Sequence, residues 1–164
     1  MKTLVQLSRD YETNRFARGY SSETTQRVSR TVGIFARDVS PKLRDLTNKN
    51  IFEWADRRRE SGTAQSTVYA DFNSLRSFMR FLDDSKIKYP ATKNQIYCKP
   101  AYKDPVCLSP EEIRKIIRFA DYETGLLIRL LYTGGMRISE VLDMTIDDLG
   151  PNNEIRVTNS KWCK

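Results

Sequence analysis

The sequence is built around one stretch, Leu130-Leu131-Tyr132-Thr133-Gly134-Gly135-Met136-Arg137-Ile138-Ser139-Glu140-Val141-Leu142. An apolar run typical of a buried helix stops at two adjacent glycines, and a second helical pattern starts immediately afterwards. Because glycine adopts backbone conformations that other residues avoid, the two glycines predict a tight turn. The spacing of Ile138, Val141 and Leu142 predicts an apolar helix face, which leaves Arg137 at the junction and held by packing on both sides.

Arg137 has two interpretations from spacing alone. A guanidinium held rigidly between two packed helices is suited to binding a phosphate through two parallel hydrogen bonds. The alternative is a helix hairpin in which Arg137 pairs with Glu140, because side chains three residues apart on a helix are neighbours. The spacing does not choose between them.

The charge of the chain is concentrated in its first part. The 164 residues are 39% hydrophobic and 30% charged, which is typical of a globular protein with one domain or two small ones. Residues 1–100 hold 19 Lys and Arg against 11 Asp and Glu, whereas residues 101–164 hold 9 against 10. This asymmetry predicts a basic module that binds a polyanion, nucleic acid above all, joined to a nearly neutral module. The alternative is a solvated surface with a high isoelectric point.

Several classes of site are disfavoured by the composition. The chain has no histidine, which is the commonest general base and metal ligand. Cys98, Cys107 and Cys163 lack a C-x-x-C spacing, so neither a disulfide framework nor a zinc site is predicted. We therefore expect no cofactor and no metal. No apolar run approaches the roughly 18 residues that span a bilayer, and the first six residues turn polar too soon for a signal peptide, so we expect a cytoplasmic protein without membrane contact.

Four helices are predicted in the first half of the chain. They cover residues 2–18, residues 21 or 22 to 39, residues 47 or 48 to 59, and residues 64–82, with breaks at Gly19, Pro41 and Ser61-Gly62. In the fourth helix the residues at a three and four spacing predict a buried stripe: Val68, Phe72, Leu75, Phe78, Met79 and Leu82. Arg76 and Arg80 lie four apart on another face. Adjacent like charges weaken a helix, so a phosphate between them would explain the pair.

The periodic pattern is lost between residues 83 and 108, where three prolines interrupt a polar stretch. We therefore predict domains at 1–84 and 108–164, with a linker over 85–107. The second domain begins with a capping box from Ser109 to Glu112. Its first helix is predicted to bury Ile113, Ile116, Ile117 and Ala120, and a further helix is predicted over 124–132. Residues 155–158 alternate as a strand, and since one strand is not stable alone, we expect a sheet of which only part lies in these residues.

The order of these parts resembles that of the tyrosine recombinases, also called phage integrases. The resemblance runs over nearly all 164 residues, and the segments that carry it are Arg18-Gly19-Tyr20-Ser21-Ser22-Glu23-Thr24, Ser66-Thr67, Leu75-Arg76-Ser77-Phe78-Met79-Arg80-Phe81-Leu82, Leu108-Ser109-Pro110-Glu111-Glu112-Ile113 and Gly135-Met136-Arg137-Ile138-Ser139-Glu140-Val141-Leu142. It implies a mainly α fold. A four-helix core-binding (SAM-like) domain would be followed by the helical start of a mixed α+β catalytic domain with a small β-hairpin or sheet.

The resemblance also implies a chemistry and a set of residues. In this family a tyrosine attacks a DNA phosphate and forms a 3′-phosphotyrosyl link, while arginines stabilise the charge on the phosphate oxygens. Arg137 matches the first catalytic arginine, and Glu140 and Gly135 would support its motif. Lys161 is the preferred candidate for the hairpin lysine that acts as general acid, with Lys164 as the other candidate.

Double-stranded DNA and further recombinase protomers are the partners that the resemblance implies. The residues expected at DNA phosphates are Arg27, Arg30, Ser66, Thr67, Arg76 and Arg80.

Two departures from the family pattern affect the expected activity. Gly134 stands where the family most often has threonine. The second arginine motif and the nucleophilic tyrosine do not appear, since the last tyrosine, Tyr132, precedes Arg137 and is expected to be buried in its helix. We therefore expect these residues to bind DNA as part of a recombinase and to be inactive alone. The alternatives are a stand-alone DNA-binding accessory or integrase relic, and a helical module that binds acidic proteins.

Overall fold

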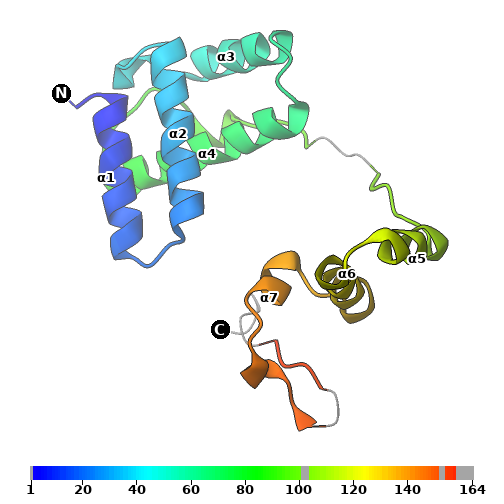
Figure 1. Cartoon of the computed structure of the whole chain (residues 1–164). Helices are drawn as coiled ribbons and strands as arrows, with labels where there is room; N and C mark the ends of the chain where they lie inside the picture. The colour runs from blue at the N-terminus through cyan, green and yellow to red at the C-terminus, as the bar shows by residue number, and fades with distance from the viewer. Residues whose placement is uncertain (1, 101–103, 152–153, 158–164) are drawn as a thin grey trace. The chain divides into compact units, whose positions relative to one another are not determined.

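The computed structural model describes residues 2–100, 104–151 and 154–157. It is mainly helical, as the sequence predicted, and divides into two compact units, Met1–Lys103 and Asp104–Lys164 (Figure 1). Among the described residues, no helix is long and apolar enough to cross a membrane.

The first unit contains the four helices that the sequence predicted, with bounds that agree within about two residues. They are α1 (Leu4–Ala17), α2 (Ser22–Asp38), α3 (Asn48–Glu60) and α4 (Gln65–Asp84), and two short 3-10 turns, η1 (Leu43–Asp45) and η2 (Lys93–Gln95), accompany them. Thr3 caps α1 by accepting from the backbone N–H of Gln6 at 3.2 Å, and the Gln6 side chain accepts from the Thr3 backbone at 2.9 Å. Gly19, just beyond α1, has φ +73°, a conformation that favours glycine.

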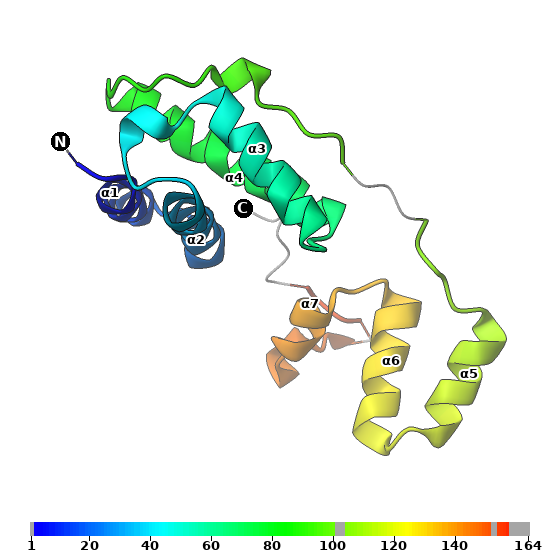
Figure 2. The same cartoon turned by 90° about the horizontal axis from the view of Figure 1, so that it is seen from above.

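The core of the first unit lies where α1 and α2 pack side by side and α4 runs across them (Figures 1 and 2). All six residues of the predicted α4 stripe are buried. Tyr11 of α1 packs edge-on against Phe78 and Phe81, with ring centroids 6.2 and 5.5 Å apart. Trp54 of α3 is also buried. Each large apolar side chain buried in this way contributes about 1.5–3 kcal/mol.

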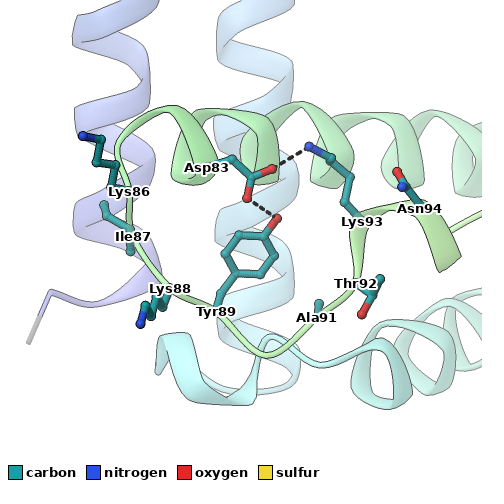
Figure 3. A pocket seen from close by; sticks show the side chains of 9 residues that line it. All are labelled: Asp83, Lys86, Ile87, Lys88, Tyr89, Ala91, Thr92, Lys93 and Asn94. Atoms are coloured by element: carbon teal, nitrogen blue, oxygen red, sulfur yellow. Dashed lines mark hydrogen bonds and ion pairs between the residues drawn. The ribbon is translucent and has the colours of Figure 1, made fainter.

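The segment after α4 packs back on the first unit. At its start, Lys86 adopts φ +56° and the Ile87 N–H donates to the Leu82 carbonyl at 2.9 Å, which closes α4 with a Schellman motif. Asp83 then accepts from the Tyr89 hydroxyl at 2.8 Å and from Lys93 Nζ at 2.5 Å (Figure 3). Further along, Ile96 is fully buried. The first part of the segment predicted as a linker over 85–107 is therefore held against the helices by its apolar side chains.

The second unit contains α5 (Pro110–Phe119), α6 (Tyr122–Gly134), α7 (Ile138–Leu142) and the 3-10 turn η3 (Ile146–Asp148). The capping box predicted at the start of α5 is present, since Ser109 and Glu112 exchange hydrogen bonds of 3.2 and 2.8 Å. Within the described residues, β structure is limited to one antiparallel bridge between Leu149 and Ile155. The predicted strand pairs at its first residue, while Thr158 lies outside the described residues and the hairpin stays a prediction.

The apolar faces predicted to be buried in the second unit are largely exposed. Ile116 and Tyr132 have exposed fractions of 43% and 52%, and among the described residues of this unit only Gly125 and Asp148 are buried. The predictions of a buried α5 face and a buried Tyr132 are wrong for the described residues. The physical reason is that the helical period sets which residues share a face, but another element must cover that face to bury it.

Candidate functional site

The turn that carries Arg137 is set by its glycines. Gly135 ends α6 in the left-handed conformation, at φ +61°. The backbone then extends at Arg137, at φ −78° and ψ 152°, before α7 begins at Ile138. The turn predicted at the glycine pair is therefore confirmed, and Arg137 occupies the N-cap position of α7.

The pairing of Arg137 with Glu140 is also present. The Arg137 backbone N–H donates to Glu140 Oε2 at 2.8 Å, and its Nη1 donates to Glu140 Oε1 at 2.7 Å. These two bonds hold the pKa of the Glu140 carboxyl below its usual value, and the bond from the backbone N–H has the larger effect. Glu140 thus stays ionised and ties the guanidinium to the first turn of α7.

Arg137 is not embedded in a core. Its side chain is 55% exposed, whereas that of Glu140 is 9% exposed. The predicted apolar face of α7 is open as well, because Ile138 and Leu142 are 58% and 69% exposed. The expectation that packing on both sides holds Arg137 is therefore wrong for the described residues, where the bonds to Glu140 restrain it. The guanidinium is open to an incoming anion.

Replacing each of the two glycines of this turn with alanine should have opposite effects on the stability of the protein. Gly135→Ala places a Cβ in the left-handed conformation and should destabilise the turn by about 1–2 kcal/mol. Gly134→Ala is the matched control, because Gly134 belongs to α6 and its new Cβ would meet only the flexible Met136 side chain at 3.2 Å. Alanine is the better helix former there by about 1 kcal/mol. Thermal unfolding followed by circular dichroism measures both changes, and equal stabilities would contradict the assigned turn.

The residues expected to bind DNA lie on α2 and α4 of the first unit. Arg27, Arg30, Ser66, Thr67 and Arg80 are exposed, and Arg76 is half-buried. The Nε of Arg76 is buried and has no hydrogen-bond partner among the described residues. Helical geometry puts Arg76 at the edge of the buried stripe and Arg80 farther round α4, away from that stripe.

A polar cluster that the sequence did not predict links three helices of this unit. Asp71 of α4 accepts from the Thr31 hydroxyl of α2 at 3.4 Å. The other Asp71 oxygen, Oδ2, forms an ion pair with Arg58 of α3, whose Nε lies 3.0 Å away. The Nε–H does not point at this oxygen, so the contact is not a hydrogen bond. The Arg58 guanidinium also lies over the Trp54 ring, 5.3 Å from its centroid. We call Thr31, Asp71, Arg58 and Trp54 the crossing cluster.

The charged members of the crossing cluster are largely withdrawn from solvent. The side chains of Arg58 and Asp71 are 21% and 10% exposed. Burial raises the pKa of the Asp71 carboxyl, against the lowering effects of Arg58 and Thr31. Arg58 lies in the Arg57-Arg58-Arg59 run in the last turn of α3, where basic side chains also interact favourably with the helix dipole. The signal that was missed is that Arg58 follows Trp54 by four residues and so shares its buried face.

Lys161 and Lys164, the two candidates for the hairpin lysine, lie outside the described residues. Among the residues that the structure describes, no group of three or more Cys, Asp or Glu is arranged to hold a metal ion.

Comparison with known proteins identifies the family of the second unit. The model of the phage integrase family matches residues 107–164, the segment that contains Arg137 and its glycine turn. This segment is thus similar to the tyrosine recombinase, or phage integrase, family.

Relatives within the tyrosine recombinase family match both units. The tyrosine recombinase XerD of Listeria monocytogenes is 28% identical over 144 residues, which cover 80% of this chain and 48% of the relative. The XerD of Rickettsia prowazekii is 23% identical over 71% of the chain and 40% of the relative. An integrase/recombinase of Escherichia coli is 43% identical over 51 residues, 31% of the chain and 15% of the relative. The chain thus spans about half the length of the XerD relatives that it matches.

Proposed function

We propose that this chain binds duplex DNA as part of a site-specific tyrosine recombinase, which breaks and rejoins DNA through a 3′-phosphotyrosyl intermediate. The observation that carries the proposal is the family match over residues 107–164, which includes an exposed arginine restrained in a glycine turn. The helical unit would be the core-binding domain and would hold the DNA. Other recombinase protomers would be its protein partners.

In this proposal Arg137 acts on the phosphate at which the strand breaks. Cleavage places extra negative charge on the non-bridging phosphate oxygens, and a positioned guanidinium stabilises that charge more strongly than it stabilises the ground state. Glu140 would orient Arg137 through the two hydrogen bonds described above. Lys161 is proposed as the general acid toward the leaving oxygen. Because a stabilised transition state needs a nucleophile, we expect the 164 residues alone to bind DNA without cleaving it.

Affinity for DNA would come mainly from backbone phosphates. The basic excess lies in residues 1–100, with 19 Lys and Arg against 11 Asp and Glu. The exposed basic side chains of α2 and α4 would meet the phosphates, together with the hydroxyls of Ser66 and Thr67 near the start of α4. Such contacts release counterions, so binding should weaken steeply as salt rises.

The test is a fluorescence-anisotropy titration of labelled duplex DNA with the 164-residue chain at several salt concentrations. In the double variant Arg76→Gln/Arg80→Gln, the negative slope of log K against log salt should become shallower by about 1.8, since each lost phosphate contact removes about 0.9 from its magnitude. Arg9→Gln/Arg44→Gln is the control, because it removes the same charge from exposed positions on α1 and η1. Equal slopes for the two double variants would refute the placement on α4, and absence of salt-dependent binding by the unmodified chain would refute DNA binding.

A further inference from the structure

We infer that Arg58 is a preorganised phosphate-binding residue of the helical unit, and that Asp71 and Trp54 are the residues that position it. The inference rests on the proposed DNA binding and deepens it. It adds a contact from α3, whereas the sequence placed all expected contacts on α2 and α4.

The first argument is the restraint on the Arg58 guanidinium. Asp71 Oδ2 lies 3.0 Å from Nε, and the Trp54 ring lies under the guanidinium carbon at 5.3 Å. Trp54 is itself fixed, because it is 1% exposed and its Nε1 donates to Asp38 Oδ2 at 3.1 Å. An arginine held on one edge and one face has little conformational freedom left to lose when it binds a ligand.

The second argument is that the two terminal nitrogens of Arg58 remain available to bind a ligand. Within the part of the chain that the structure describes, Nη1 and Nη2 of Arg58 make no hydrogen bond; the charge of Arg58 also acts on the Asp38 carboxylate, and the side chain remains 21% exposed. The two terminal nitrogens form the edge of a guanidinium that binds a phosphate through parallel hydrogen bonds. The ion pair with Asp71 uses the opposite end, at Nε. Arg58 can therefore keep its positioning partner and bind a phosphate at the same time.

The third argument is location. Asp71 and Thr31 mark a point where α4 and α2 meet. Arg27 precedes Thr31 by one helical turn and Thr67 precedes Asp71 by one helical turn, and both are exposed. Two of the expected DNA contacts therefore flank the crossing cluster on different helices. A duplex that touches both would pass close to Arg58.

The sharpest variant is Arg58→Gln/Asp71→Asn, which leaves the net charge of the chain unchanged and leaves no buried charge without a partner. Burial disfavours the charged form of Asp71, so neutralising the pair should cost little stability. Arg44→Gln/Asp45→Asn is the matched control, since it neutralises an exposed Arg–Asp pair at 4.0 Å on η1. Thermal unfolding by circular dichroism confirms that each variant is folded at the temperature of the binding assay.

The readout is the salt dependence of binding to labelled duplex DNA. The slope of log K against log salt is negative. We expect it to become shallower by about 0.9 for Arg58→Gln/Asp71→Asn and to stay unchanged for the control. A slope equal to that of the unmodified chain overturns the inference and leaves the proposed DNA binding intact. If the unmodified chain shows no salt-dependent binding, both fail together.

Asp71→Asn alone tests the positioning role separately. It makes the chain more positive by one charge, which by long-range attraction alone would strengthen DNA binding. If Asp71 positions Arg58, binding should instead weaken by about two- to tenfold, because the guanidinium must then be ordered on binding. Stronger binding than that of the unmodified chain would overturn the positioning role. Should Asp71→Asn fail to fold, Arg58→Lys serves, since it keeps the charge and the slope but loses the planar fork and should weaken binding.

Discussion

Replacing Arg137 with alanine should lower the rate of DNA strand cleavage by about a hundredfold or more in the recombinase that we propose. The loss follows from removing a donor aimed at charge that develops in the transition state. DNA affinity should change far less, because most of the binding energy comes from the many contacts to backbone phosphates. The measurement is the rate at which a covalent protein–DNA adduct forms on a nicked duplex substrate, with affinity measured in parallel.

Arg129→Ala is the matched control for this prediction. Arg129 is an exposed arginine of α6, so its loss changes the charge of the same unit by the same amount. A cleavage rate that falls equally in both variants would mean that only overall charge matters, and would remove Arg137 from the active site. A loss in Arg137→Ala that appears entirely as weaker DNA binding would make it a binding residue instead.

Replacing Phe78 with alanine should destabilise the helical unit by about 3–5 kcal/mol. Phe78 is fully buried, and its ring lies 6.2 Å from those of both Tyr11 and Phe81, so truncation leaves a cavity between α1 and α4. A loss of this size is comparable to the whole stability of many small domains, about 5–15 kcal/mol. Guanidinium unfolding followed by circular dichroism measures it, and DNA affinity should fall with the folded fraction.

Phe16→Ala provides the comparison for Phe78. Phe16 lies on α1 and is 44% exposed, so its truncation removes the same atoms with little cavity formation. Phe16→Ala should lower the free energy of unfolding by well under half as much as Phe78→Ala does. Equal losses would show that Phe78 does not occupy the core position that the structure gives it.

The helices were predictable because their signals are local. A stop residue such as Gly19 and a capping box such as that of Ser109 and Glu112 act within a few residues, so they remain visible in a linear sequence. The same holds for the turn before Arg137 and for its pairing with Glu140. The residues expected at DNA phosphates came from the family resemblance, and in the structure all of them except the half-buried Arg76 are exposed.

The segment after α4 was not predictable in this way. Its prolines and polar residues suggested a free linker, but Ile96 and Cys98 are buried against the helices. Strand and helix periods give no signal for an irregular segment that packs through a few separated side chains.

By itself, the sequence determined where helices begin and end, which residues share a face, the position of Arg137 at a glycine turn, and the resemblance to the recombinase family. Only the tertiary structure decided which faces are covered and which side chains from different helices meet. Phe78 is buried while Ile116 is exposed, although both lie on regular apolar stripes. Arg58, Asp71 and Thr31 come together from three helices up to 40 residues apart. The physical reason is that burial and ion pairing depend on distances between elements, whereas caps, turns and periodicity depend on neighbours along the chain.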